Sequence, residues 1–331
     1  AVKAAGKTYS AHKFILATGS SPFIPPVPGL EKGTYITFKE AVDFKKLPES
    51  LLISGGGPVG CEFAQIFQSF GTKVTLVNRS EKLLGKEDTE TAELIKALFE
   101  NQGINVLTNT AMTSVQKKGR KKIVRLKTGE KVSFKEFDEI LIATGKVSVL
   151  DFAPEKAGIE VEKGRINVNN LLQTNVPHIY AAGDIVGPYL FTHTGYYQSY
   201  MAANNAFSNK KMKPDYSVVP RCVFTTPEVA SVGIGENEAI EKGIKIKKGI
   251  MAISILGRAN TSNEFDGFVK VIADKNGVLI GGSIVAARAG EMIHELALAI
   301  KCNVKASDLA DMIHAYPTYS EGIKIACSLV E

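Results

Sequence analysis

The sequence predicts an α/β protein in which one parallel-sheet domain is inserted into a second domain. Two observations predict this organisation. A β-strand, a glycine loop, a helix and a second β-strand follow one another over residues 51–77, an order typical of a parallel α/β unit. Two apolar segments that both end in Ala-Thr-Gly, residues 14–19 and 139–145, bracket this unit, as crossings between two domains would. The chain has 331 residues, 44% of them hydrophobic, which suffices for about two to three domains with cores of their own.

The glycine loop is the most informative motif. The apolar segment 51–54 runs directly into Gly-Gly-Gly-Pro-Val-Gly, and an amphipathic helix that ends near Gly71 follows. In this context a GxGxxG pattern predicts a dinucleotide site: Gly55 permits the tight turn, Gly57 lets the backbone approach a pyrophosphate, and Gly60 permits close packing of helix on strand. The helix N-terminus adds free N–H groups and a positive dipole. The predicted dinucleotide-binding residues of the loop are Gly55, Gly57, Pro58, Val59 and Gly60.

The remaining elements of this domain follow from hydrophobic periodicity. The helix is expected to bury one apolar face, formed by Val59, Phe63, Ile66, Phe67 and Phe70. We expect a strand over 73–77, a helix over 88–102, a strand over 104–107, a hairpin over 113–132 and a buried strand over 139–145. The basic run 117–122 falls at the hairpin tip without interleaved aromatic residues, so we interpret it as a solvated turn and predict no nucleic-acid partner.

The end of the strand at 73–77 indicates which dinucleotide binds. An NAD site usually has Asp or Glu about 20 residues past the glycine loop, where it accepts hydrogen bonds from the ribose hydroxyls. Asn78 stands there, Arg79 follows, and the nearest carboxylate, Glu81, lies beyond the strand. Because no carboxylate repels a 2′-phosphate and Arg79 could pair with one, NADPH is favoured over NADH. Asn78 and Arg79 are therefore predicted cofactor-binding residues, and a solvated loop charge is the alternative for Arg79.

Composition excludes several classes of protein. No apolar run reaches the roughly 18 residues of a membrane span, and the first residues form no apolar signal segment. The 40 basic and 34 acidic residues leave a dispersed net charge of +6, too small an excess to predict nucleic-acid binding. The four cysteines contain no CxxC or CxxxxC pair, and a reducing cytoplasm is the expected compartment. Cys61, Cys222, Cys302 and Cys327 are all expected to be small buried hydrophobes.

Several motifs together resemble one family. They are the two Ala-Thr-Gly segments, GGGPVGCE at 55–62, IYAAGD at 179–184, TTPEVA at 225–230 and HAYPTYSE at 314–321. In this order, and over essentially the whole chain, they resemble the flavoprotein disulfide reductases, the pyridine nucleotide-disulfide oxidoreductase family that includes lipoamide dehydrogenase, glutathione reductase and mercuric reductase. The resemblance implies a Rossmann-type NAD(P)-binding domain inserted in a partial FAD-binding domain and followed by an α+β interface domain.

The resemblance also implies domain boundaries and a partner. Residues 1–32 would be a remnant of the FAD-binding domain, 33–147 the NAD(P)-binding domain, 148–216 the returning part of the FAD-binding domain and 217–331 the interface domain. Family members dimerise through the interface domain, which contributes to the active site of the partner subunit. We therefore expect a homodimer.

Individual residues acquire roles from the same resemblance. Asp184 would hydrogen-bond the ribityl chain of FAD. The helix that starts at 191–194 would face the flavin pyrimidine, where a helix N-terminus stabilises the negative charge of reduced flavin. Glu62 would lie at the nicotinamide–flavin contact, with a carboxylate that merely favours the helix dipole as its alternative. The further cofactor-binding residues implied are Thr18, Gly19, Gly145, Gly183, Thr192 and His193.

Two departures from the family pattern affect this assignment. The family's N-terminal FAD-binding unit, with its own glycine loop and a redox-active CxxxxC pair, has no counterpart in these residues. We expect a fragment or a truncated relative, and favour a fragment. The residues at the C-terminal end also lack the cysteine pair with which mercuric reductase receives its metal.

The second departure is an altered C-terminal motif. Thiol-processing members have a histidine directly before the proline, which acts as acid and base and is oriented by a glutamate. Here Tyr316 precedes Pro317, as in mercuric reductase, while Glu321 is kept. A phenol with a pKa of about 10 is a poor base at neutral pH, so His314 is a candidate substitute, with packing at a domain interface as its alternative. The candidate catalytic residues are Tyr316, Glu321, Glu62 and His314, and no metal-binding residue is predicted.

The sequence thus predicts an oxidoreductase in which hydride passes from NADPH or NADH to FAD and on to a disulfide, a metal ion or another small-molecule acceptor. Two alternatives stay open. One is a dinucleotide-binding and dimerisation module without turnover, and the other is an NADPH oxidase or quinone reductase without redox cysteines. No membrane partner is predicted, and the sequence does not identify the electron acceptor.

Overall fold

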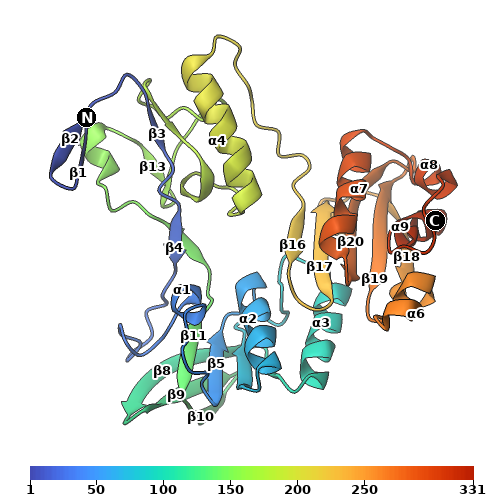
Figure 1. The fold of residues 1–331 in the computed structure, drawn as a ribbon, viewed down its shortest axis with the longest axis horizontal. Helices are drawn as coiled ribbons and strands as arrows, with labels where there is room; N and C mark the ends of the chain where they lie inside the picture. Colours follow the sequence, from blue (N-terminus) through green and yellow to red (C-terminus); the bar gives the residue numbers. More distant parts are fainter. The chain divides into compact units, whose positions relative to one another are not determined.

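The computed structural model describes residues 1–331 and has the mixed α/β fold that the sequence predicts (Figure 1). The chain forms two compact units. Unit 1 comprises residues 1–23 and 146–216, and unit 2 comprises residues 24–145 and 217–331. Each unit is therefore built from two separate stretches of the sequence, and each Ala-Thr-Gly segment lies close to a point where the chain changes unit.

Unit 2 contains the parallel sheet expected around the glycine loop. Its strand order is β11-β5-β6-β7, and neighbouring strands run parallel. The strands are β5 (Ser50–Ser54), β6 (Lys73–Val77), β7 (Asn105–Leu107) and β11 (Glu139–Ile142), and the helices are α1 (Phe38–Ala41), α2 (Pro58–Ser69) and α3 (Thr89–Asn101). Most side chains of β5 and β11 are buried, which explains why these segments are continuous apolar runs. Helices α2 and α3 lie side by side (Figure 1), and Gln65 Nε2 donates a hydrogen bond of 2.9 Å to Gln102 Oε1.

The buried face of α2 differs from the prediction. Phe67 is buried as expected, but Ile66 and Phe70 are 46% and 68% exposed. The face turned to the core consists instead of Gly60, Cys61, Ala64 and Phe67. Small residues in the first two turns let the helix approach the sheet closely, so the side of α2 with Gly60, Cys61 and Ala64 is buried, and Ile66 and Phe70 stay exposed.

An antiparallel sheet replaces the predicted hairpin over 113–132. It has three strands in the order β10-β9-β8: β8 (Thr110–Lys118), β9 (Lys121–Thr128) and β10 (Lys131–Phe137). The basic run lies at the turn between β8 and β9, as expected, but it is not solvated throughout. Lys122 is only 6% exposed, forms an ion pair with Glu139 and donates a hydrogen bond of 2.9 Å to the carbonyl of Asp138. A lysine is tolerated there because its charge is paired and its donors are satisfied.

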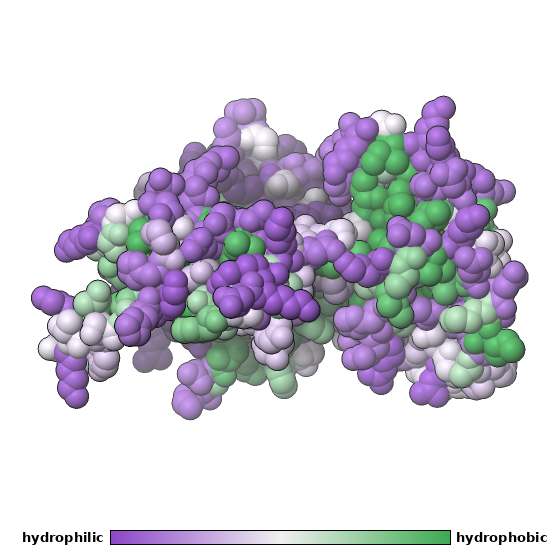
Figure 2. All heavy atoms as spheres, turned by 90° about the horizontal axis from the view of Figure 1, so that it is seen from above, coloured by the Kyte–Doolittle hydropathy of each residue, from purple (hydrophilic) through white to green (hydrophobic).

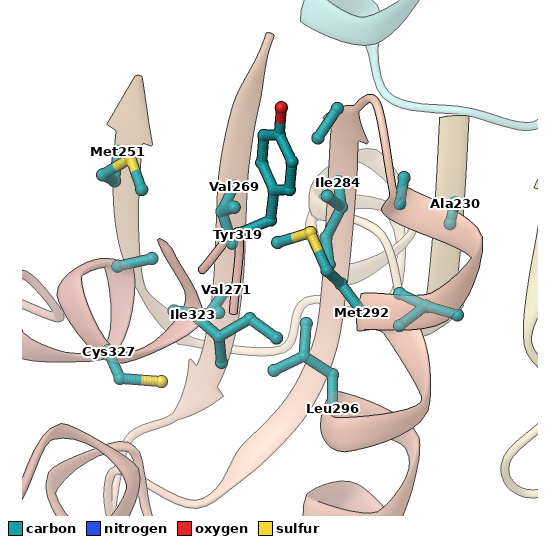
Figure 3. Close-up of a cluster of buried hydrophobic side chains, with 14 of the residues drawn as sticks. Ala230, Met251, Val269, Val271, Ile284, Met292, Leu296, Tyr319, Ile323 and Cys327 are labelled. Carbon is teal, nitrogen blue, oxygen red and sulfur yellow. The ribbon is translucent and has the colours of Figure 1, made fainter. Parts of the chain in front are cut away.

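The C-terminal stretch of unit 2 is an α+β structure. Its five-stranded antiparallel sheet has the order β16-β17-β20-β19-β18. The strands are β16 (Arg221–Val223), β17 (Glu228–Gly233), β18 (Ile246–Ala252), β19 (Phe268–Asp274) and β20 (Leu279–Ala286). The helices are α5 (Glu236–Glu241), η3 (Ile253–Ile255), α6 (Gly257–Ser262), α7 (Ala289–Lys301), α8 (Ala306–Asp311) and α9 (Glu321–Ser328). Leu296 of α7 and Ile323 of α9 pack with Val269 and Ile284 of the sheet in one apolar core (Figure 3).

Unit 1 is built from short strands and one long helix. Its strands pair only in twos: β3–β15 is parallel, and β1–β2, β4–β12 and β13–β14 are antiparallel. The strands are β1 (Val2–Ala4), β2 (Lys7–Tyr9), β3 (Phe14–Leu16), β4 (Ser20–Pro22), β12 (Lys146–Ser148), β13 (Val161–Glu162), β14 (Arg165–Ile166) and β15 (Ile179–Ala181). The helices are η1 (Pro154–Ala157), η2 (Gly183–Ile185) and α4 (Thr192–Phe207). Two small apolar clusters hold the unit together, one of them under α4.

The burial of the cysteines differs from the prediction at one position. All four thiols are free; Cys61 and Cys327 are buried and Cys222 is partly buried, but Cys302 is exposed just after α7. The expectation of burial is therefore wrong for Cys302, which follows the last turn of its helix instead of facing the core. None of the helices combines the length and the apolar character required to cross a membrane.

Candidate functional site

The three spaced glycines of the loop between β5 and α2 differ in how much space surrounds the position of a Cβ. Gly55 has a φ of +119°, and a Cβ there would lie 2.3 Å from the carbonyl oxygen of Ala143. A Cβ at Gly60 would lie 1.8 Å from the carbonyl oxygen of Gly55. A Cβ at Gly57 would meet no atom within 4 Å. Two of these glycines are therefore required by the fold, whereas Gly57 faces open space that a ligand could occupy.

The start of α2 is arranged to receive an anion. Gly57 is the N-cap residue and offers no side chain to the first turn, and Pro58 follows at the first helical position. Helix α1 shows the contrast, because there the Thr37 side chain accepts a hydrogen bond from the Lys39 N–H and Glu40 completes a capping box. The N–H groups that follow Pro58, those of Val59 and Gly60, thus have no side-chain acceptor at the end of a 12-residue helix.

Asn78, directly after β6, stabilises the glycine loop through hydrogen bonds. Its Oδ1 accepts a hydrogen bond of 3.1 Å from the N–H of Gly56, and its Nδ2 donates to the carbonyls of Ser80 (3.1 Å) and Lys82 (2.7 Å). The amide thus joins the glycine loop to the segment after β6. The next side chain, Arg79, is exposed and has neither an ion pair nor a hydrogen bond of its own, so its guanidinium is available to a ligand.

The second Ala-Thr-Gly segment lies against the same loop. The N–H of Ala143 donates a hydrogen bond of 2.8 Å to the carbonyl of Ser54, the last residue of β5. Gly145 has a φ of +116° and open space around the position of a Cβ. The end of β11 therefore forms one wall of the glycine loop, and the chain leaves unit 2 directly after it.

Glu62, on the first turns of α2, is tied to the loop between β16 and β17. Its Oε1 accepts a hydrogen bond of 3.0 Å from the N–H of Phe224. Burial raises the pKa of the Glu62 carboxyl, and this hydrogen bond partly opposes the shift. Gln65, one turn later, makes two hydrogen bonds to Thr226, accepting from its N–H at 2.7 Å and donating to its carbonyl at 2.8 Å. The sequence did not indicate Gln65, because its partner is 161 residues away.

In unit 1, Asp184 is held by residues from two other segments. Ser20 Oγ donates a hydrogen bond of 2.5 Å to Asp184 Oδ2, and Lys146 Nζ lies 3.7 Å from the same oxygen. Ser148 Oγ donates to the Asp184 carbonyl at 3.0 Å. Strands β4 and β12 pair with Ser20 opposite Ser148, which places all three side chains beside the aspartate. The sequence did not assign these residues, although Ser20 and Lys146 each follow directly after an Ala-Thr-Gly segment.

Gln198 of α4 fixes the turn that carries Asp184. This amide is fully buried. Its Oε1 accepts a hydrogen bond of 2.7 Å from the N–H of Gly183, and its Nε2 donates to the Gly187 carbonyl (2.8 Å) and to Tyr216 Oη (2.7 Å). A buried amide that satisfies three partners defines one conformation of the turn, so Gln198 is a positioning residue for Asp184.

The start of α4 offers a second uncapped helix N-terminus. Phe191 is the N-cap and makes no side-chain cap, while Thr192 and His193 lie exposed on the first turn. The rings of Phe191 and His193 stack at 5.1 Å. The hydroxyl of Thr194 is buried without a hydrogen-bond partner. A carboxylate, free helix N–H groups and an orphaned hydroxyl within one unit fit the polar groups of a flavin nucleotide.

Two further predicted residues of unit 1 connect its strands. Thr18 Oγ1 donates a hydrogen bond of 2.9 Å to the carbonyl of Val149, and the Val149 N–H donates to the Gly19 carbonyl at 3.0 Å. Gly19 has a φ of +73°, which favours glycine. Thr18 and Gly19 thus lie beside Val149, near the start of the second stretch of unit 1 (residues 146–216). Gly183 lies with Asp184 in η2.

The C-terminal motif does not form the dyad that the family pattern implies. Tyr316 is 79% exposed. The carboxylate of Glu321 accepts a hydrogen bond of 2.9 Å from the N–H of Thr318 and none from Tyr316. His314 is turned away from solvent, with Nε2 at 2.9 Å from Glu295 Oε1 and Nδ1 at 3.2 Å from the Met312 carbonyl. His314 and Tyr316 therefore have different surroundings, and both ring nitrogens of His314 are occupied.

No group of three or more His, Cys, Asp or Glu side chains is arranged to hold a metal ion.

Comparisons with known proteins match both parts of the chain. The family described as "Pyridine nucleotide-disulphide oxidoreductase" matches residues 1–209, and its dimerisation domain matches residues 219–327. A mercuric reductase of Bacillus cereus is 34% identical over 328 residues, which cover 98% of this chain and 52% of that protein. A dihydrolipoyl dehydrogenase of Thermus scotoductus is 37% identical over 325 residues, 96% of this chain and 70% of that protein.

A solved structure is similar over almost the whole chain. The HOCl-induced flavoprotein disulfide reductase RclA from Escherichia coli has a TM-score of 0.90 at 29% sequence identity, covering 96% of this chain and 74% of that chain. The present chain spans between 52% and 60% of the length of the mercuric reductases of Bacillus cereus, Staphylococcus aureus and Lysinibacillus sphaericus that it matches.

Proposed function

The chain belongs to the pyridine nucleotide-disulphide oxidoreductase family of flavoproteins, and from this premise we propose that it reduces a small-molecule acceptor with NADPH, with FAD as the bound redox cofactor. The observation that carries the proposal is the glycine loop. Gly57 faces open space at the uncapped start of α2, whereas Gly55 and Gly60 have no room for a side chain. This combination supports a site for the pyrophosphate of a dinucleotide.

The segment after β6 supports NADPH over NADH. A carboxylate that would accept hydrogen bonds from the ribose is absent, because Asn78 occupies the strand end and its amide is bonded within the protein. Arg79 is exposed and unpaired beside it. A free guanidinium without a neighbouring carboxylate favours a 2′-phosphate.

The residues of unit 1 that would hold FAD are Asp184, supported by Ser20, Lys146 and Gln198, and the first turn of α4. When bound there, FAD would supply a two-electron acceptor for hydride. Asp184 would offer an acceptor to the ribityl hydroxyls, and the N–H groups at the start of α4 would stabilise negative charge on the flavin.

The C-terminal motif bears on the electron acceptor. Tyr316, which is exposed, stands directly before Pro317, and Glu321 accepts from the N–H of Thr318, so no imidazole oriented by Glu321 lies at that position. Acceptors that require an imidazole at that position as a proton shuttle, as the disulfides of oxidised lipoamide and glutathione do, are therefore disfavoured. A disulfide of another kind, a metal ion or a further small molecule fits the proposal.

We propose a homodimer formed through residues 217–331. Large apolar side chains lie exposed on this part of unit 2, among them Leu298 (66%), Ile313 (91%) and Tyr316 (79%). Figure 2 shows hydrophobic atoms gathered on the side of the molecule that the C-terminal helices and strands form. Burying such a surface in a second copy removes it from water.

The test is a visible absorption spectrum of the purified protein before and after anaerobic NADPH. A flavin band that bleaches with NADPH supports the enzyme. A colourless protein that still enhances NADPH fluorescence supports a dinucleotide-binding module without turnover, and a protein that binds neither refutes both. The Gly57→Ala variant tests the glycine loop directly. It should keep the fold, since its Cβ meets no atom, and NADPH should no longer bleach its flavin band.

A further inference from the structure

The antiparallel sheet of β8, β9 and β10 and the residues directly after it hold most of the net charge of the chain. Residues 110–139 contain nine cationic and four acidic residues, a net charge of +5, whereas all 331 residues together have +6. The nine cationic residues are Lys117, Lys118, Arg120, Lys121, Lys122, Arg125, Lys127, Lys131 and Lys135. The positive charge is therefore less evenly dispersed than the composition alone suggests.

Pairing within the protein uses up only part of this charge. Three of the cations form ion pairs with carboxylates: Lys121 with Asp138, Lys122 with Glu139 and Lys127 with Glu130. The other six form no ion pair, and Arg125 among them donates a hydrogen bond to Thr113 Oγ1 at 3.1 Å. Two carboxylates without an ion pair, Glu49 and Glu136, act electrostatically on Lys121. Unpaired cations thus outnumber them on this sheet.

Strand β10 forms an open edge of the same sheet (Figure 1). It pairs with β9 over seven residues in one unbroken register, from Lys131 opposite Thr128 to Phe137 opposite Lys122. In an antiparallel pair, alternate residues point their N–H and C=O groups away from the partner strand. No backbone group elsewhere in the protein forms a hydrogen bond with these outward groups of β10.

The other edge strands of unit 2 are either covered by backbone or short. On β18, Lys248 exchanges two backbone hydrogen bonds of 3.4 and 3.5 Å with Glu331. On β11, two backbone hydrogen bonds of 2.8 and 2.9 Å join the strand to Ile36, and on β8 the Val115 N–H donates to the Pro28 carbonyl at 2.9 Å. The remaining edges, β7 and β16, have only three residues each. β10 is therefore the one long edge of unit 2 without a backbone partner.

The side chains of β10 do not protect this edge fully. Proteins usually block an edge strand with a proline, a bulge or charged residues, and β10 has neither a proline nor a bulge. Phe134 is 66% exposed and Val132 is 43% exposed. They stand opposite Arg125 and Lys127 of β9, so apolar and cationic side chains share one face of the sheet. Lysines on an edge strand discourage pairing, but an exposed phenylalanine beside them favours contact with a partner.

We propose that β10 binds an extended acidic segment of a partner polypeptide, which joins the sheet as a fourth strand. The outward N–H and C=O groups of β10 would form hydrogen bonds with the added strand. Phe134 and Val132 would contact its apolar side chains, and the unpaired cations of the sheet would attract its carboxylates. A second copy of this chain fits this edge less well, because it would bring two sheets with a net charge of +5 together.

The test uses the purified protein and a fluorescein-labelled seven-residue peptide that alternates glutamate and valine. We expect fluorescence anisotropy to show binding, and hydrogen exchange over residues 131–137 to slow when the peptide is bound. Methylation of every backbone N–H of the peptide should abolish binding, because it removes the hydrogen bonds of an added strand. A peptide with lysine in place of glutamate should not bind, because its charge has the same sign as that of the sheet.

Two variants of β10 have matched controls elsewhere in unit 2. Phe134→Thr removes an apolar contact and Lys131→Glu reverses a charge, so each should weaken binding of the peptide by about fivefold. The control for the first is Ile240→Thr, a position that is also 66% exposed. The control for the second is Lys245→Glu, an exposed lysine outside the sheet. Both controls should change the affinity by less than about twofold.

Several results would overturn the proposal. A peptide that does not bind, or whose methylated form binds equally well, would rule out strand addition. Variants of β10 that bind the peptide as their controls do would place the contact elsewhere. Sedimentation velocity in which Phe134→Thr converts a dimer to a monomer would assign the edge to a second copy, and displacement of the peptide by a 20-base-pair DNA duplex would assign the sheet to nucleic acid. Circular dichroism of the four variants, which alter only exposed side chains, checks that they fold.

Discussion

The starts of α2 and α4 are two uncapped helix N-termini built in different ways. The site at α2 is made of backbone from one continuous stretch, residues 54–60, and glycine provides the room for it. The site at α4 depends on side chains from separate segments: Ser20, Lys146 and Gln198 all act on the turn of Asp184. A site of the first kind should fail when a glycine gains a side chain, and a site of the second kind when a distant partner is removed.

The largest effect is expected from Gly60→Ala. Its Cβ would lie 1.8 Å from the Gly55 carbonyl oxygen, so either α2 or β5 must shift. We expect a loss of about 3 kcal/mol or more in the free energy of unfolding, as for an overpacked core without freedom to relax. Urea denaturation measures it. Gly57→Ala, three residues away, should stay within about 0.5 kcal/mol of wild type while losing NADPH affinity; equal destabilisation by both would show that the loop has no open side.

Gln198→Leu tests the second kind of site. The substitution leaves the Gly183 N–H and the Gly187 carbonyl without their buried partner, which should cost about 2–3 kcal/mol and free the turn of Asp184. FAD affinity, measured by ultrafiltration of the protein with added FAD, should fall. Ser199→Ala is the matched control, because its exposed hydroxyl bonds only to Tyr196 of the same helix. If the variant loses stability but binds FAD as tightly as wild type, Gln198 does not position Asp184 for FAD.

This contrast also explains what the sequence could predict. The glycine loop, β5 and β6 could be predicted because strand, GxGxxG loop, helix and second strand follow one another within about 30 residues, and α3 because its apolar periodicity is local. The supports of Asp184 could not be predicted, since Ser20 and Asp184 are 164 residues apart and meet only through strand pairing, of β3 with β15 and of β4 with β12. Burial on α2 was misjudged because hydrophobicity alone favours Phe70, whereas close packing favours Ala64.

The C-terminal motif shows another limit of sequence. The spacing of His314, Tyr316 and Glu321 suggests cooperation, yet His314 turns to Glu295 and Glu321 to the backbone of Thr318. Side-chain direction in an irregular segment has no period from which it could be inferred. The roles of these residues remain predictions.

Arg79→Ala is expected to have a smaller effect, confined to one dinucleotide. An exposed guanidinium that pairs with a 2′-phosphate contributes about 1.4 kcal/mol, or roughly tenfold in affinity. NADPH affinity should fall by that factor and NADH affinity by less than about twofold, since NADH has no 2′-phosphate. Fluorescence titration with both nucleotides measures this. Equal loss for the two would contradict recognition of the 2′-phosphate, and no loss would leave Arg79 a solvated charge.

The smallest effect is expected from Glu62→Gln, and it concerns pH. Burial raises the pKa of Glu62 in the folded protein, so the folded state keeps this proton to higher pH than the unfolded state does. The contribution to stability is then fully present below the unfolded pKa and is lost as pH rises through the folded pKa.

Glutamine keeps an oxygen acceptor for the Phe224 N–H but cannot ionise. The melting temperature of Glu62→Gln relative to wild type should therefore rise as the pH increases from about 4 to about 7. Glu93→Gln, at an exposed position of α3, is the control and should give a difference that does not rise in this way. If the difference in melting temperature between Glu62→Gln and wild type does not change with pH, the loop between β16 and β17 leaves this carboxylate hydrated. The hydrogen bond from Phe224 would then hold Glu62 in place without desolvating it.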